Sequence, residues 1–271
     1  MKKNTQLIIW IVLAILAFVL CAFICTNIVI AKTHEVKNPV ATLEIENYGT
    51  VKIELYPEYA PNTVANFINL INKGFYTGKV FYGKDVNAIY AVKTADGEEA
   101  EPTMSLVDST IEAGSDSDVK YQINGEFVAN KFEQNTLKHE KGVVSMLREN
   151  YSSYFGLTEQ GYNSGSSHFQ IMLENNRNLN GMYAAFGKVT EGLDIVEKIF
   201  NSEVTSDDAA EEATEEVDTS SNKISDFATP AVIKSATVET YGVDYGAPEV
   251  HQAFDYSAFL QTYFNQYYTN E

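Results

Sequence analysis

The chain has 271 residues, 45% of them hydrophobic, which is enough to build a core in one large domain or two small ones. Its 19 Lys and Arg residues against 37 Asp and Glu residues give a net charge of −18, which argues against nucleic-acid binding because phosphate contacts require clustered cations. Both cysteines fall in the N-terminal apolar run and the four histidines are scattered, so the sequence indicates no metal site and no cofactor.

The N-terminus carries two lysines, followed by an almost unbroken apolar run over residues 7–31. About 20 apolar residues suffice to span a bilayer, and lysines before such a run stay in the cytoplasm. We therefore predict that residues 1–32 are a transmembrane anchor, or an uncleaved signal, in a single-pass cell-membrane protein with its folded domain outside the cytoplasm. The alternative is a signal peptide cleaved after Ala31, although signal h-regions are usually shorter, about 7–15 residues.

A hairpin and a helix follow a polar spacer over residues 33–39. Residues 40–46 and 51–55 alternate apolar and polar side chains, which predicts two strands with one buried face. A helix is expected from Pro61 to Gly74, because apolar residues recur at i, i+3, i+4 and i+7 between them.

The stretch over residues 141–189 contains three short strand-like runs, 142–146, 168–173 and 182–189. Turn-forming Ser, Asn and Gly residues separate these runs. Short β runs at this spacing favour a barrel or a sandwich whose loops present a surface.

The same stretch resembles the cyclophilin-type peptidyl-prolyl cis-trans isomerases. The family patterns G-x-L-S-M-A, N-x-x-G-S-Q-F-F-I and L-D-G-x-x-x-V-F-G-K-V match, in order and spacing, Gly142-Val143-Val144-Ser145-Met146-Leu147, then Asn163-Ser164-Gly165-Ser166-Ser167-His168-Phe169-Gln170-Ile171, then Leu179-Asn180-Gly181 with Phe186-Gly187-Lys188-Val189. The resemblance implies a mainly β fold: a closed antiparallel eight-stranded barrel capped by two helices. The second of these helices would be residues 190–199.

On this reading residues 40–241 form the cyclophilin-like domain, with acidic insertions at 97–120 and 201–226. Residues 242–271 form a tail in which aromatic residues recur at helical spacing. We expect a tail helix that packs on the barrel. The alternative is a helix that docks onto a partner protein or a membrane surface.

The resemblance weakens where the family carries its catalytic arginine. Aligned without a gap, Gly83 occupies the arginine position and Ala91 the family's glutamine position, and Ala88 and Ile89 stand where Phe and Met would line the proline pocket. Lys84 comes one residue late, and a strand would turn it to the opposite face. No catalytic residue is therefore assigned, and Lys84 is a poor substitute.

The resemblance also implies positions that contact a substrate peptide. Leu179 matches the pocket leucine, and Gln170 replaces a pocket phenylalanine. The full set of expected substrate-binding residues is Phe81, Ile89, Met146, Leu147, Arg148, His168, Gln170, Leu179 and Tyr183.

The sequence thus predicts a membrane-anchored isomerase-like protein that acts on X-Pro bonds of exported, unfolded proteins, with weakened catalysis. The alternative is a non-catalytic cyclophilin-fold module that binds peptides or a partner protein. In either case we expect proline-containing peptides as ligands. His139, an acid/base candidate by residue type, matches a framework histidine of the family.

Overall fold

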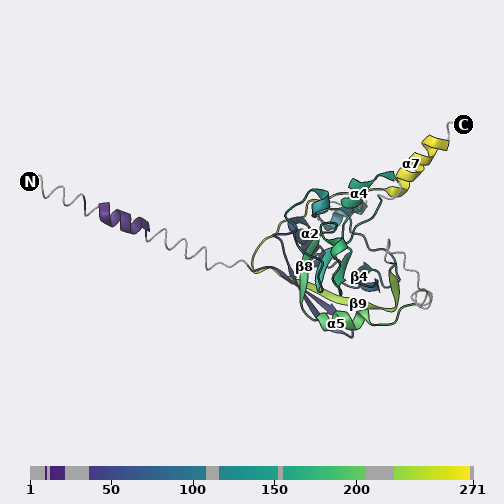
Figure 1. The fold of residues 1–271 in the computed structure, drawn as a ribbon, viewed down its shortest axis with the longest axis horizontal. Helices are drawn as coiled ribbons and strands as arrows, with labels where there is room; N and C mark the ends of the chain where they lie inside the picture. The colour runs from purple at the N-terminus through teal and green to yellow at the C-terminus, as the bar shows by residue number, and fades with distance from the viewer. Residues whose placement is uncertain are drawn as a thin grey trace, which may run out of the picture. The chain divides into compact units, whose positions relative to one another are not determined.

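Eight antiparallel strands close into a barrel in the order β1-β2-β8-β6-β7-β4-β3-β9 (Figure 1). The strands are β1 (Val40–Ile45), β2 (Gly49–Leu55), β3 (Val80–Lys84), β4 (Ala88–Lys93), β6 (Val143–Met146), β7 (Phe169–Met172), β8 (Ala185–Glu191) and β9 (Ser225–Glu239). This closure confirms the eight-stranded barrel expected from the sequence, and it leaves the barrel without an open sheet edge.

The computed structural model describes residue 10 and residues 13–21, 37–107, 116–151, 155–205 and 223–268. Contacts divide the chain into two units, Met1–Lys37 and Asn38–Glu271, and residues 13–21 of the first unit are helical. The anchor predicted over residues 1–32 lies largely outside the described residues. Across these ranges, no helix combines the length and apolar content needed to cross a membrane.

Alternating side chains explain the first hairpin. Leu43 of β1 and Val51 of β2 are fully buried and lie opposite each other in the register. Asn47 and Gly49 adopt positive φ angles of 62° and 125°, which Asn and Gly tolerate better than other residues, so the chain can reverse between the strands.

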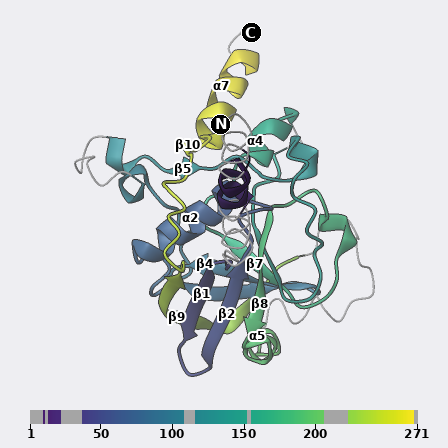
Figure 2. The ribbon, with the colours of Figure 1, turned by 90° about the vertical axis from the view of Figure 1, so that its left-hand side faces the viewer.

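Two helices cap the barrel, as expected: α2 (Pro61–Asn72) and α5 (Leu193–Phe200) (Figure 2). Phe67 of α2 is fully buried, and its ring centroid lies 5.6 Å from that of Phe169 and 5.1 Å from that of Phe186. In α5, Val196 and Ile199 are buried in the same core. The predicted start of this helix was three residues early, because the chain up to Glu191 still pairs in β8.

A buried carboxylate accepts hydrogen bonds from the backbone N–H groups at the start of α2. Ala60 at the N-cap offers no side-chain acceptor, and Glu126 instead accepts hydrogen bonds from the backbone N–H groups of Asn62 (2.9 Å) and Thr63 (2.7 Å) and from the Thr63 hydroxyl (2.7 Å). Negative charge at a helix N-terminus is favourable, so Glu126 ties α2 to the loop after β5 (Tyr121–Gln122).

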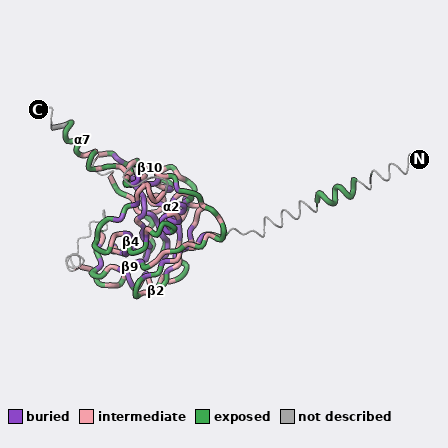
Figure 3. The backbone as a smooth tube through the Cα atoms, turned by 180° about the vertical axis from the view of Figure 1, so that it is seen from behind, coloured by how far each residue is buried: buried purple, intermediate pink, exposed green. Residues whose placement is uncertain are grey.

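The barrel wall separates two apolar clusters. In β4, Ile89 and Ala91 point into the main core, whereas Ala88 and Tyr90 belong to a smaller cluster on the other face. This is the two-residue periodicity of a strand that is covered on both sides. In the backbone coloured by burial, the buried segments gather within the barrel domain, whereas α7 is intermediate or exposed (Figure 3).

The remaining elements are short or lie after the barrel. They are η1 (Met104–Leu106), η2 (Asp116–Asp118), η3 (Val128–Asn130), α4 (Thr158–Tyr162), η4 (Arg177–Leu179), β10 (His251–Gln252) and α7 (Tyr256–Tyr268). The predicted tail helix is confined to α7, and β10 pairs with β5 before it. β9 begins at Ser225, inside the region expected to be insertion.

His139 gives the barrel a pH-dependent stability. The side chain is 2% exposed, and burial lowers its pKa from 6.5 to about 4, although its Nδ1 lies 3.3 Å from the side-chain oxygen of Asn180. Between pH 6.5 and about 4 the unfolded chain therefore binds a proton that the folded chain does not, and stability falls as the pH falls. We expect a loss on the order of 3 kcal/mol over this window.

Urea unfolding at pH 7 and pH 4.5 measures this loss, with His139→Gln as the comparison. The variant lacks the titrating ring, so its stability should fall less than that of the unaltered chain. Equal losses in the two proteins would contradict the assignment.

Candidate functional site

A cavity of about 1020 Å³ opens on the outer face of the barrel. Its floor comes from β4 and β7, and its sides come from the segment after β6 and from the chain between β10 and α7. The volume lies at the top of the range of cavities that enclose drug-sized ligands, so it can hold a peptide of several residues.

Six of the nine expected substrate-binding residues line this cavity: Leu147, Arg148, His168, Gln170, Leu179 and Tyr183. The structure does not bring Phe81, Ile89 and Met146 there. They are 0%, 0% and 3% exposed and pack in the main core inside the barrel. The reason is strand periodicity, because residues next to one another in a strand point to opposite faces.

The same periodicity places residues at the cavity that sequence reasoning missed. Tyr82, Tyr90 and Met172 lie on the outer face, one position from the core residues Phe81, Ile89 and Ile171. Counting outward from those core positions would have identified all three. Ile224 also lines the cavity, and it packs with Leu179 against the outer apolar cluster. It comes from a low-complexity region without periodicity, which carried no such signal.

Polar groups on the cavity floor are paired. Tyr90 donates a hydrogen bond to Oδ2 of Asp85 (3.0 Å), while Oδ1 of Asp85 accepts from the backbone N–H groups of Asn87 and Ala88 (both 2.7 Å). Burial, strengthened by the Asp85 charge, raises the pKa of Tyr90 far above its usual value. Gln170 is 2% exposed and donates to the hydroxyl of Ser145 (2.9 Å).

The position aligned with the family's arginine has no room for a side chain. A Cβ placed on Gly83 would lie 2.8 Å from the carbonyl oxygen of Ser225 and 2.8 Å from Cγ2 of Ile224. The cause is the irregular pairing of β3 with β9, which shifts between Phe81 and Gly83. The start of β9 therefore covers the place that an arginine stem would use.

Nearby cations point elsewhere or are held by neighbours. The Lys84 ammonium lies 5.1 Å from the ring centroid of Phe200, and Lys84 does not line the cavity. Arg148 does line it, but its Nε donates to the carbonyl oxygen of Met182 (3.0 Å) and one terminal nitrogen donates to that of Glu149 (3.1 Å). The Arg148 guanidinium also lies 4.6 Å from the ring centroid of Tyr183.

Three glutamates line the cavity, Glu99, Glu101 and Glu149. His168 Nε2 lies 3.0 Å from a carboxylate oxygen of Glu99, and this hydrogen bond is the main cause that lowers the pKa of Glu99. Lys120 forms an ion pair with Glu101. Removal from water raises the pKa of Glu149, and the negative charges of Glu99 and Glu101 add to the rise.

Hydrogen bonds fix the segment before β7 that carries His168. Asn66 of α2 donates to the carbonyl oxygen of Ser166 (2.5 Å) and accepts from the Tyr121 hydroxyl (2.7 Å). The Ser164 hydroxyl accepts from the backbone N–H of Glu149 (2.7 Å), so the segments that carry Glu149 and His168 are held together. Within the described part of the chain, no group of three His, Cys, Asp or Glu residues could hold a metal ion.

Known proteins are similar to this chain in sequence. Residues 40–221 match the family model described as "Cyclophilin type peptidyl-prolyl cis-trans isomerase/CLD". Peptidyl-prolyl cis-trans isomerase B of Bacillus subtilis is 31% identical over 160 residues, which cover 59% of this chain and 90% of that protein. A probable peptidyl-prolyl cis-trans isomerase of Brucella suis is 28% identical over 210 residues, 75% of this chain and 96% of that protein.

Solved structures agree on the fold. The crystal structure of a cyclophilin-type peptidyl-prolyl cis-trans isomerase from Cryptosporidium parvum, in the presence of the dipeptide ala-pro, superposes with a TM-score of 0.51 at 18% identity. The match covers 74% of this chain and 98% of that one.

The close approach of β9 to Gly83 predicts that Gly83→Ala destabilises the fold. The added methyl group must displace a backbone carbonyl, which costs about 1–3 kcal/mol, comparable to overpacking a core. Urea unfolding measures the loss. Lys84→Ala on the same strand is the control, and because it removes only a contact with an aromatic face it should cost no more than about 1 kcal/mol. Equal stability of Gly83→Ala and the unaltered chain would contradict the predicted contact.

Proposed function

Because the chain belongs to the cyclophilin-type peptidyl-prolyl cis-trans isomerase family, we propose that it acts on X-Pro bonds of exported proteins outside the membrane, with weakened catalysis. The cavity beside β4 and β7 is the peptide site of this proposal. The location outside the membrane rests on the lysines and the apolar run over residues 7–31, as in the sequence analysis.

Isomerisation of an X-Pro bond requires no covalent step. Amide resonance sets a barrier of roughly 20 kcal/mol, and a protein lowers it by binding the twisted amide more tightly than either planar form. In our proposal Ala88, Leu179 and the other cavity-lining members of the outer apolar cluster accept the proline ring, and polar groups of the cavity hold the flanking peptide.

Two features support weakened catalysis. The family resemblance assigns an arginine to hydrogen-bond the prolyl nitrogen as resonance is lost, and Gly83 at that position has β9 against it. The cation next along the strand, Lys84, lies over Phe200. One charged hydrogen bond to a transition state contributes roughly 3 kcal/mol, about two orders of magnitude in rate.

The alternative is a non-catalytic peptide-binding module with the same cavity. The observation in its favour is that Gly83 lacks not only the guanidinium but also the space for one. Binding without turnover needs only the apolar cluster and the polar cavity walls.

A protease-coupled assay on a proline-containing peptide separates the two functions. We expect acceleration above the uncatalysed rate, but at least about 100-fold below that of an arginine-bearing cyclophilin at the same concentration. Turnover equal to that relative would contradict weakened catalysis. Saturable peptide binding without any acceleration would favour the alternative, and the absence of both binding and acceleration would contradict both functions.

The proposed proline site predicts that Leu179→Ala weakens peptide binding. Loss of an apolar contact of this size should reduce affinity about tenfold, measured by calorimetry with a proline-containing peptide. Leu137→Ala is the matched control, because Leu137 packs against the same cluster but does not line the cavity. A similar loss in both variants would indicate a general effect on packing and contradict the assigned contact.

A further inference from the structure

The chain after the barrel returns to the cavity. Following β9, the side chain of Asn62 at the start of α2 exchanges hydrogen bonds with the backbone of Glu249: its amide donates to the carbonyl oxygen (2.9 Å) and its oxygen accepts from the N–H (2.7 Å). β10 then pairs with β5, His251 opposite Gln122 and Gln252 opposite Tyr121. The path of the chain past α2 to β10 is visible in Figure 2.

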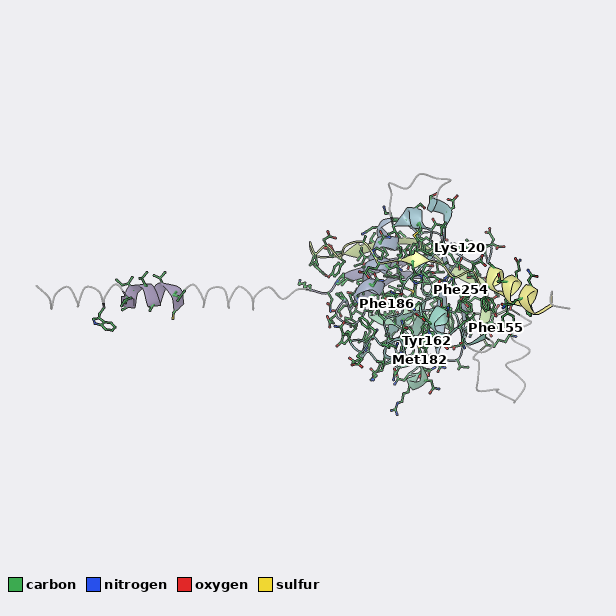
Figure 4. All side chains as sticks on the ribbon, turned by 90° about the horizontal axis from the view of Figure 1, so that it is seen from above. Lys120, Phe155, Tyr162, Met182, Phe186 and Phe254 are labelled. Atoms are coloured by element: carbon green, nitrogen blue, oxygen red, sulfur yellow. The ribbon has the colours of Figure 1, made fainter. Side chains whose placement is uncertain are left out.

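Two more hydrogen bonds hold the next residues in place. The backbone N–H of Ala253 donates to the carbonyl oxygen of Lys120 (2.9 Å), and that of Phe254 donates to the side-chain oxygen of Gln122 (3.0 Å). Lys120 and Phe254 are labelled in Figure 4. In both bonds the tail contributes a backbone N–H group, so the main chain of the tail is fixed without using its side-chain polar groups.

Residues 252–257, which we call the tail wall, line the cavity. Aromatic contacts, some of them with Tyr151, which lines the cavity too, hold the tail wall in place. The rings of Tyr151 and Tyr256 stack at 4.9 Å with an interplanar angle of 14°, and the rings of Tyr151 and Phe254 lie 5.5 Å apart. Phe155 contacts Tyr263 of α7 at 4.9 Å. The wall is therefore supported by both β5 and the segment after β6.

The tail wall adds aromatic surface to the cavity. The barrel face carries Ala88 and Gln170 where the resemblance implies Phe, and Tyr82, Tyr90 and Tyr183 line the cavity there. Phe254 and Tyr256 line the same cavity and are only half-buried, so part of their aromatic surface remains exposed. At about 1020 Å³ the cavity exceeds what a dipeptide needs.

We propose that the tail wall is a second peptide-binding surface, on which Phe254 and Tyr256 hold an apolar or aromatic side chain of a residue flanking the proline. The inference rests on the proposed function, because it extends the same site. The ligand is then a peptide of several residues that carries such a side chain next to the X-Pro pair. The X-Pro pair alone would not reach the tail wall.

Two peptides and three variants test the tail wall. The peptides are the dipeptide Ala-Pro and an eight-residue peptide with phenylalanine residues flanking one Ala-Pro pair, and binding to the full chain is measured by calorimetry. Tyr256→Ala and Phe254→Ala should each weaken binding of the long peptide about twofold to tenfold, as expected for an aromatic contact, and leave the dipeptide unchanged. Phe264→Ala is the control, because Phe264 lies on α7, is 44% exposed and does not line the cavity.

Several results would overturn the proposal. Long-peptide affinity that is unchanged in both variants would show that the tail wall does not bind, and tighter binding would show that it covers the site instead. Equal losses for both peptides would indicate damage to the proline end. If the unaltered chain binds neither peptide, the proposed function is contradicted as well. If both peptides bind and their affinities are the same in the variants, only the role of the tail wall is contradicted.

A second measurement covers the case in which a variant does not fold. The long peptide, carrying a photo-reactive benzophenone in place of one phenylalanine, is irradiated with the unaltered chain and the labelled residues are identified by mass spectrometry. Labels within residues 252–257 support the tail wall. Labels confined to the barrel overturn it.

Discussion

The two-residue alternation of side chains across the barrel wall is the constraint on which the site depends. Phe169 and Ile171 of β7 must face inward to complete a core with α2, so Gln170 and Met172 must face outward. The same rule orients Tyr90 between Ile89 and Ala91 in β4. The cavity floor is thus a consequence of core packing, and a substitution that shifted the register would exchange the two faces together.

The close approach of β9 to β3 determines which side chains the site can hold. β9 runs so near β3 that only a glycine fits at residue 83, and Ile224 then packs into the outer apolar cluster from the same segment. The strand pairing that leaves no room for a side chain at residue 83 thus also brings Ile224 to the outer apolar cluster. A site built this way keeps an apolar floor for a proline ring, yet it offers no guanidinium at the aligned position.

The cavity is completed by parts of the chain outside the barrel strands. Glu99 and Glu101 come from the segment after β4, and Phe254 and Tyr256 come from the segment before α7. Each is held by a hydrogen bond or ion pair or by ring stacking with a neighbour: Glu99 with His168, Glu101 with Lys120, Phe254 with Gln122 and Tyr256 with Tyr151. The cavity on the outer face of the barrel is large because these surrounding segments are anchored beside the strands and add to its walls.

The sequence by itself determined the family, the barrel and its two capping helices, because local periodicity and motif order record them residue by residue. It also placed Leu179, Tyr183 and His168 at one surface, since their motif positions imply it. Only the tertiary structure decided that Phe81, Ile89 and Met146 face the core, that β9 closes over Gly83, and that Phe254 and Tyr256 reach the cavity. The inward orientation of the first three follows from the strand register, which core packing sets. The closure over Gly83 and the return of the tail depend on a register shift and on pairing between segments more than 100 residues apart, which no local pattern encodes.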